Sequence, residues 1–265
     1  MVISIVTHFA RFGMEVHAGK IKLRGESKSV ILFCSKPYFI YNNPDDYDDT
    51  DLSDIIVSHD RYIPIVDNFS YLGSIISTNC TDNNDVETRI RKAGSAFGAL
   101  SKSIFSSPYV NRKTKAMVYT SLILPILLYG SECWCLTERL LRKLRTFHHQ
   151  CVRKMCNVTR LDTRILHIKT TDLLESLFLD PIDLYICKNQ LRWAGHVFRM
   201  PWNRMPRKML TSWVRSPRPR GCPKMTYGRS LKKSITKCGI DFATWHELAL
   251  NRGDWKYLIE NLTLN

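Results

Sequence analysis

The sequence predicts an α+β fold that is predominantly helical, with a small N-terminal β region followed by helices. Up to about residue 80, short apolar runs are separated by Gly, Pro, Asn and Asp, which is typical of short strands. From Asp82 onward the apolar residues recur at the spacing of an amphipathic helix. We therefore expect three regions, which are residues 1–80 with β structure, a helical segment at 81–160 and a basic helical region at 161–265.

The N-terminal region combines candidate strands with one acidic loop. Residues 1–12 predict a short helix that ends at Gly13, a plausible C-cap. Residues 42–54 are crowded with Asp and are led by Asn and Pro, so we expect a solvated loop there. Short strands are predicted at 14–17, 29–34, 55–57 and 62–66. Residues 69–76 are expected to form a strand or hairpin arm, with Gly73 at a point of close approach.

The helical part contains amphipathic segments whose apolar and basic residues separate. One stripe is formed by Leu140, Leu144, Phe147, Cys151 and Met155 in the clearest of them. In the first predicted helix, Val86, Ile90, Ala93, Phe97 and Leu100 share one face, and Arg89, Arg91 and Lys92 are expected on the opposite face. The expected helices run from about 82 to 103, from about 112 through the apolar run 116–129, along 139–155, from about 181 to 200, and within 226–262.

Two further stretches are constrained by proline. The apolar run 116–129 contains Pro125 and is too short to span a bilayer comfortably, so we interpret it as a buried core segment. Residues 215–224 are basic and contain three prolines, which forbid a helix and predict a linker or extended arm.

Charge divides the chain unevenly. Residues 1–88 hold 7 Lys and Arg against 13 Asp and Glu, a balance of −6, whereas residues 89–265 hold 32 against 11, a balance of +21. A basic region of this size attracts polyanions, because each phosphate that it neutralises releases a condensed counterion. The composition therefore favours a nucleic-acid ligand over a merely soluble basic protein.

The nine cysteines show no repeating spacing, and we expect free thiols in a reducing compartment. His148, His149, Cys151 and Cys156 are clustered, but Cys151 belongs to an apolar stripe. Buried thiols are therefore favoured over a zinc site, and no metal ligands are assigned. The N-terminus lacks the features of a signal peptide, so we expect a nuclear or cytoplasmic protein that is not secreted and has no membrane partner.

Five segments follow one another along the chain as an ordered set of motifs. They are Phe69-Ser-Tyr-Leu-Gly, Leu127-Leu-Tyr-Gly-Ser-Glu-Cys-Trp, Leu191-Arg-Trp-Ala-Gly-His-Val-Phe-Arg-Met, Arg220-Gly-Cys-Pro-Lys and Asn251-Arg-Gly-Asp-Trp. Together these segments resemble the reverse transcriptases of non-LTR (LINE-type) retrotransposons. Lys28 and its strand resemble the end of the polymerase palm in that family, and Cys222 departs from the usual basic residue of its motif.

The resemblance implies a palm remnant, a helical thumb and a nucleic-acid-binding C-terminal region. It implies a primer-grip-like role for Phe69, Tyr71, Leu72 and Gly73, although an ordinary sheet strand fits these residue types equally well. Trp193, Trp202 and Trp213 alternate with arginines, a composition that suits stacking on unpaired bases, although tryptophans are also frequent core anchors. Candidate nucleic-acid contacts are Lys28, Arg89, Arg91, Lys92, Arg112, Lys113, Arg142, Lys143, Arg145, Arg192, Trp193, His196, Arg199, Arg204, Arg207, Arg218, Arg220 and Lys224.

RNA-directed DNA polymerases of this family hold two metal ions with an Asp on one palm strand and an Asp-Asp pair on a neighbouring hairpin. We expect that hairpin to precede residue 1. Asp45-Asp46 and Asp48-Asp49 lack the aromatic residue two positions before the pair, so we assign no catalytic residues and no cofactor. Mg²⁺ is expected only for a full-length parent polymerase.

We thus expect a truncated, transposable-element reverse transcriptase segment, inactive alone, that grips an RNA template and a DNA primer or target DNA. The missing catalytic part is a further expected partner. A domesticated non-catalytic DNA- or RNA-binding protein and a basic helical protein-interaction scaffold remain the alternatives.

Overall fold

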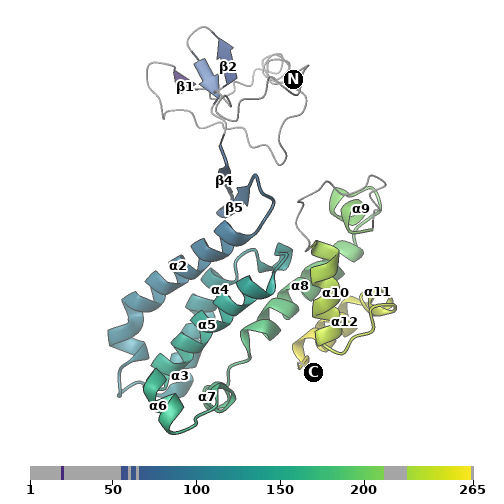
Figure 1. Cartoon of the computed structure of the whole chain (residues 1–265). Helices are drawn as coiled ribbons and strands as arrows, with labels where there is room; N and C mark the ends of the chain where they lie inside the picture. Colours follow the sequence, from purple (N-terminus) through teal and green to yellow (C-terminus); the bar gives the residue numbers. More distant parts are fainter. Residues whose placement is uncertain (1–18, 21–54, 59–60, 64–65, 212–225, 264–265) are drawn as a thin grey trace. The chain divides into compact units, whose positions relative to one another are not determined.

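A computed structural model of the chain describes residues 19–20, 55–58, 61–63, 66–211 and 226–263 (Figure 1). The chain forms two units, Met1–Thr81 and Asp82–Asn265. The expected strands at 14–17 and 29–34, the helix at 1–12 and the acidic loop at 42–54 lie outside the described residues. The predicted fold class is confirmed, because helices dominate the described residues and the strands belong to small antiparallel sheets. The three-region division remains a prediction.

The described part of the first unit is antiparallel β structure. Its three-stranded sheet has the order β1-β3-β2, with β1 (Gly19–Lys20), β2 (Ile55–Ser58) and β3 (Arg61–Ile63). Two of these strands coincide with the strands expected at 55–57 and 62–66.

A hairpin follows in the same unit, made by β4 (Asn68–Tyr71) and β5 (Ser74–Ser77). The two residues between the strands, Leu72 and Gly73, have φ values of 48° and 86°. Positive φ at both positions matches the two-residue turn that follows the natural twist of a hairpin. The sequence predicted Gly73 at a close approach within a strand or hairpin arm, whereas the structure places it in the turn between β4 and β5.

The second unit is helical. Asn111 begins α3 and its side chain accepts a hydrogen bond from the Thr114 N–H, which satisfies one of the free donors of the first turn. Two five-residue segments are wound as π-helix, as shown by the Ser106 N–H bonding to the Ser101 carbonyl at 2.8 Å. The elements are α2 (Asn83–Leu100), η2 (Ser101–Phe105), α3 (Arg112–Val118), η3 (Tyr119–Ile123), α4 (Leu124–Leu127), η4 (Ser131–Cys133), α5 (Glu138–Met155), α6 (Arg160–Ile165), α7 (Thr170–Ser176), α8 (Ile182–Phe198), α9 (Met205–Thr211), α10 (Tyr227–Lys237), α11 (Trp245–Leu248) and α12 (Arg252–Glu260).

Two hydrophobic clusters stabilise this unit, and α8 contributes to both. The first cluster contains residues of α2, α3, α4, α5 and α7 and of the start of α8, among them the buried Val86, Leu144 and Ile186. The second cluster packs the rest of α8 against α10, α11 and α12, with Leu191 and Ile235 fully buried. Burial of this apolar surface is the main force that holds these helices together.

The predicted helices correspond to α2, to α3 with η3 and α4, to α5 and to α8. The predicted helical region 226–262 is divided into α10, α11 and α12, and α6, α7 and α9 were not predicted. None of the described helices is long and apolar enough to cross a membrane. Within 116–129, Tyr119, Ile123 and Leu127 are fully buried, which agrees with the interpretation of this stretch as a core segment.

Candidate nucleic-acid interface

Helix α5 separates an apolar face from a basic one. Thr137 caps its start by accepting a hydrogen bond from the Leu140 N–H at 3.4 Å, and Glu138 follows in the first turn, where a negative charge is favourable. The predicted stripe is confirmed as the inward face, since Leu144 and Met155 are essentially fully buried. The basic side chains of Arg139 and Arg142 consequently face solvent.

A groove of about 450 Å³ lies between α5 and α2. Apolar side chains, Ile90 and Phe147, form part of its wall, and both are half-buried. The complete lining is Glu87, Ile90, Arg139, Arg142, Lys143, Thr146, Phe147 and Gln150. Arg142 and Lys143 were predicted as nucleic-acid contacts, whereas Glu87, Arg139 and Gln150 were not among the candidate contacts.

Glu87 reports the strength of the positive field at this groove. Its pKa is lowered first by a hydrogen bond from Lys143, next by the charge of Lys143, and further by the charges of Arg139 and Arg91. Three cations thus act on one exposed carboxylate. Because Arg142 also lines the groove, positive charge exceeds negative charge at this place.

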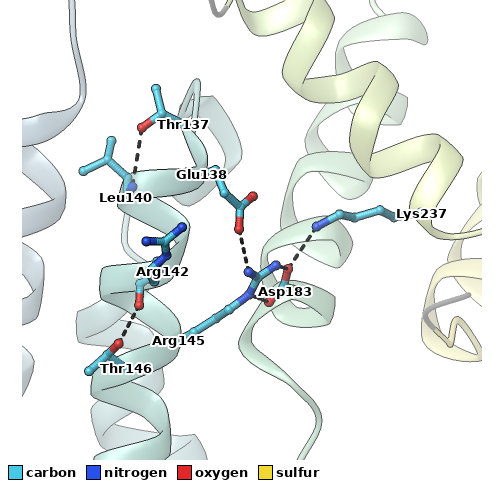
Figure 2. A network of polar contacts seen from close by, with 8 residues as sticks. All are labelled: Thr137, Glu138, Leu140, Arg142, Arg145, Thr146, Asp183 and Lys237. Carbon is cyan, nitrogen blue, oxygen red and sulfur yellow. Dashed lines mark hydrogen bonds and ion pairs between the residues drawn. The ribbon is translucent and has the colours of Figure 1, made fainter.

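Arg145 belongs to an internal ion-pair network instead of the basic groove. Figure 2 shows its guanidinium between Glu138 and Asp183, with two hydrogen bonds to Asp183 at 2.8 and 2.6 Å. Lys237 of α10 bonds the same carboxylate at 3.0 Å, so Asp183 links α5, α8 and α10. Burial acts to raise the pKa of Asp183, but the hydrogen bonds from Arg145 and Lys237 outweigh it and lower the pKa. Arg145 is thus engaged in an ion-pair network, and its contact with nucleic acid remains a prediction.

The prediction that Arg89 lies on the exposed face of the first helix is wrong. Arg89 is only 5% exposed, and its Nε lies 3.8 Å from the carboxylate of Asp85, one helical turn earlier. The guanidinium carbon is 4.2 Å from the ring centre of Tyr129, and Asp85 also accepts a hydrogen bond from the Trp134 indole at 2.9 Å. This buried group ties α2 to the Leu-Leu-Tyr-Gly-x-Glu-x-Trp segment, and it shields Arg89 from solvent.

The remaining cations of α2 and α3 are placed as expected. Arg91 and Lys92 are exposed on α2, and Arg112 and Lys113 are exposed at the start of α3. Their contact with nucleic acid remains a prediction. Lys28, Arg218, Arg220 and Lys224 lie outside the described residues, as do the Asp-Asp pairs of the acidic loop.

The exposed side of α8 carries Arg192 and His196, one helical turn apart. The half-buried ring of Trp193 lies 5.6 Å from that of His196. Arg199, in contrast, donates a hydrogen bond to the Ala249 carbonyl at 2.6 Å, and burial followed by the charge of Arg252 lowers its pKa. Arg199 thus fastens α8 to the chain that follows α11.

Beyond α8, Arg204 is exposed but Arg207 is not. Arg207 is 6% exposed and its guanidinium lies over two aromatic rings, at 3.6 Å from the centre of Phe198 and 4.6 Å from that of Trp202. The Arg207 guanidinium is therefore shielded from solvent by these rings, unlike the exposed cation that the sequence predicted.

In the hairpin, Tyr71 and Leu72 are 58% and 76% exposed, whereas Phe69 is half-buried with its ring 6.5 Å from Tyr71. The four candidate primer-grip residues thus gather at the end of β4 and in the turn. A grip function for them remains a prediction.

The histidine and cysteine cluster of α5 is a buried hydrogen-bonded group. His148 Nε2 lies 3.2 Å from the Asp180 carbonyl, which can only accept, so Nδ1 accepts from the Tyr119 hydroxyl at 2.8 Å. Burial, followed by the charge of His149, lowers the pKa of His148 to about 4, and burial raises the pKa of Cys151 to about 12. Within the described residues no group of three or more His, Cys, Asp or Glu is arranged to hold a metal ion.

Two of the motifs that carry the family resemblance have clear structural roles. Gly130 has a φ of 81°, a conformation that favours glycine, and it turns the chain so that Trp134 reaches Asp85. Gly195 lies against the indole of Trp255, where a side chain would collide with the ring.

The second unit is thus a basic helical module with a cationic groove between α2 and α5. Over its whole length the chain is 28% identical to a transposon-derived protein of Caenorhabditis elegans, in an alignment of 271 residues that covers 89% of that protein. No protein-family model matches the chain, and no solved structure matches it. The comparison relates the chain to transposon-derived sequence.

Proposed function

We propose that the second unit binds the sugar-phosphate backbone of a nucleic acid, with the groove between α2 and α5 as its central contact. The observation that carries this proposal is the gathering of Arg91, Arg139, Arg142 and Lys143 around a groove that contains one carboxylate, Glu87. A groove with apolar walls and cationic rims holds phosphates by charge while excluding water from part of the contact.

Net charge supports a polyanionic ligand. Residues 82–265 hold 32 Lys and Arg against 14 Asp and Glu, a balance of +18, whereas residues 1–81 hold 7 against 10, a balance of −3. Contacts of this kind hold the backbone without reading sequence, so the affinity should depend strongly on salt and weakly on base sequence.

We further propose that this unit derives from the thumb and C-terminal region of a LINE-type reverse transcriptase, and that its ligand is an RNA template paired with a DNA primer or target DNA. The transposon-derived relative supports the origin, and the ordered motifs support the choice of reverse transcriptase. The exposed ring and turn of the hairpin, Tyr71 and Leu72, are suited to contact a primer end.

The test is a binding titration of a fluorescently labelled RNA–DNA hybrid by polarisation, at several salt concentrations. The affinity of the wild type should fall steeply with salt. In a plot of log affinity against log salt concentration, the slope should be roughly −0.9 times the number of phosphates contacted. A variant with Arg91, Arg139 and Arg142 changed to Gln should bind at least about tenfold more weakly, with a shallower slope.

A matched variant changes three exposed cations elsewhere in the unit, Arg160, Arg164 and Lys169, to Gln. It removes the same charge, so it separates the groove from the total charge, and it should bind much more tightly than the groove variant. Equal losses in the two variants would refute the groove, and an affinity that does not respond to salt would refute backbone binding.

A further inference from the structure

Trp202 is held in an unusual position for a tryptophan. It lies in the turn between α8 and α9, where the Arg204 N–H bonds to the Pro201 carbonyl at 3.0 Å, and it is 67% exposed. Trp134 and Trp255, in contrast, are each only 2% exposed in the hydrophobic clusters. Tryptophan is enriched at binding interfaces, because its ring offers a large apolar face together with a polar N–H group.

The Trp202 ring is supported from one side by Arg207. The Arg207 guanidinium lies over the ring of Phe198 and over that of Trp202, and Phe198 belongs to the end of α8. Phe198 is in turn packed against Trp245 of the second cluster, with the ring centres 5.5 Å apart. The stack of three side chains therefore joins the exposed ring to the hydrophobic core.

The positive charge of Arg207 is stabilised by these two rings. Its Nε and Nη1 atoms are buried, and neither has a hydrogen-bond partner in the described part of the chain. A buried guanidinium without a carboxylate is costly, so its retention needs a compensating contact. The two ring faces provide part of it by cation–π attraction, and that attraction fixes the orientation of Trp202.

We infer that the outer part of the Trp202 ring is a stacking platform for an unpaired nucleobase. The inference rests on the proposed function and names a second, distinct contact within it. Every base presents a flat π face, so one indole accepts any base without reading sequence. The exposed cations Arg204 and Lys208 follow Trp202 closely in the chain and are suited to the phosphates of the strand whose base is stacked.

The charge of these neighbours favours a nucleic acid over an apolar protein segment. Met205 and Met209 are also exposed on α9, at 65% and 75%, but they alternate with Arg204 and Lys208. An arrangement of rings and cations at this spacing suits a strand that carries one phosphate per base. The platform therefore binds single-stranded ends or gaps, while the α2–α5 groove binds backbone.

The experiment compares three labelled probes, which are a single strand of twelve thymidines, the same strand with abasic sites, and a duplex. Trp202→Ala should weaken binding of the thymidine strand roughly 5- to 150-fold, which is the contribution of one stacked base, and should leave the duplex unchanged. Trp202→Phe should retain most of the affinity, because the ring is kept. Tyr257→Ala, at a ring that is 72% exposed on α12, is the control and should bind as the wild type does.

Arg207 acts through Trp202 and is a positioning residue, so Arg207→Gln should reduce the preference for the thymidine strand over the abasic strand. Equal binding of the thymidine strand by wild type and Trp202→Ala overturns the platform, and so does an equal loss for strand and duplex. A wild-type protein that binds none of the probes overturns the proposed function itself, and this outcome is distinguished by the duplex titration.

Discussion

Gly195 and Trp255 are in contact, with the indole lying where a side chain on Gly195 would be. A methyl group added at Gly195 would be 2.2 Å from Nε1 of Trp255, and the same Nε1–H donates a hydrogen bond to the Leu191 carbonyl at 3.1 Å. Trp255 is 2% exposed, so the ring has little room to move away. The Gly-His-Val segment and the Asn-Arg-Gly-Asp-Trp segment therefore depend on each other.

Gly195→Ala should destabilise the protein by about 1–3 kcal/mol, because overpacking displaces a buried ring. In a domain of this size the midpoint of thermal unfolding should fall by roughly 2–4 °C for each kcal/mol. The matched variant is Gly98→Ala in α2, where nothing lies within 4 Å of the added carbon, and it should be neutral or slightly stabilising. The midpoints of the two variants are measured by circular dichroism during heating. An unchanged midpoint for Gly195→Ala would show that the Trp255 ring can move aside without loss of stability.

Arg145→Met should cost about 1–3 kcal/mol, because Asp183 is 8% exposed and would keep a single cation, Lys237, of the two shown in Figure 2. Lys237→Met should cost less, under about 1 kcal/mol, since that lysine side chain is 40% exposed and water screens it. Urea unfolding measures both. A smaller loss for Arg145→Met than for Lys237→Met would contradict the view that the two bonds from Arg145 dominate the network.

Stability should fall on acidification because of His148. Its pKa is about 4 in the folded protein, below the ordinary value of 6.5, so the unfolded chain binds more protons between these two values. This contribution is complete above about pH 6.5 and is lost as the pH falls toward 4, up to about 3 kcal/mol. His148→Gln keeps a donor and an acceptor but does not titrate, so it should reduce this pH dependence. An unchanged slope of stability against pH in that variant would assign the effect to other groups.

Glu87→Gln should strengthen nucleic-acid binding by a few fold. Glu87 bonds to Lys143 within the groove and competes with phosphate for that cation. Removing the negative charge leaves the lysine to the ligand, the opposite effect to removing an arginine. Glu175→Gln at an exposed position of α7 is the control. Weaker binding by Glu87→Gln would mean that the carboxylate orients Lys143 productively.

The sequence predicted the long helices because their apolar spacing continues over several turns. For α5, the stripe from Leu140 to Met155 matches the buried face, and the exposed positions of Arg139 and Arg142 follow from the same period. The short helices α6, α7 and α9, of six or seven residues, are too brief to show a period. For α6 a signal did exist, since Thr159 and Asp162 form a reciprocal capping box.

Other features depend on tertiary contacts that no local pattern reveals. Arg89 lies at the border of the apolar face, and Asp85, Tyr129 and Trp134 together draw it inward. The groove likewise arises from the packing of α2 on α5, which brings Glu87 beside Lys143. Arg207 resembles any surface arginine in the sequence, and its enclosure depends on the return of α9 to α8.

Helix α8 is the common wall of two hydrophobic interiors, since Ile186 belongs to one and Leu191 to the other. Each hydrophobic cluster needs residues of α8 to be complete. A truncated version of the protein therefore cannot begin or end between residues 182 and 198. A fragment that stopped at the end of α8 would expose the apolar face of α8 that packs against α10, α11 and α12, and it would aggregate. The smallest useful expression product therefore starts near residue 82 and extends through α12.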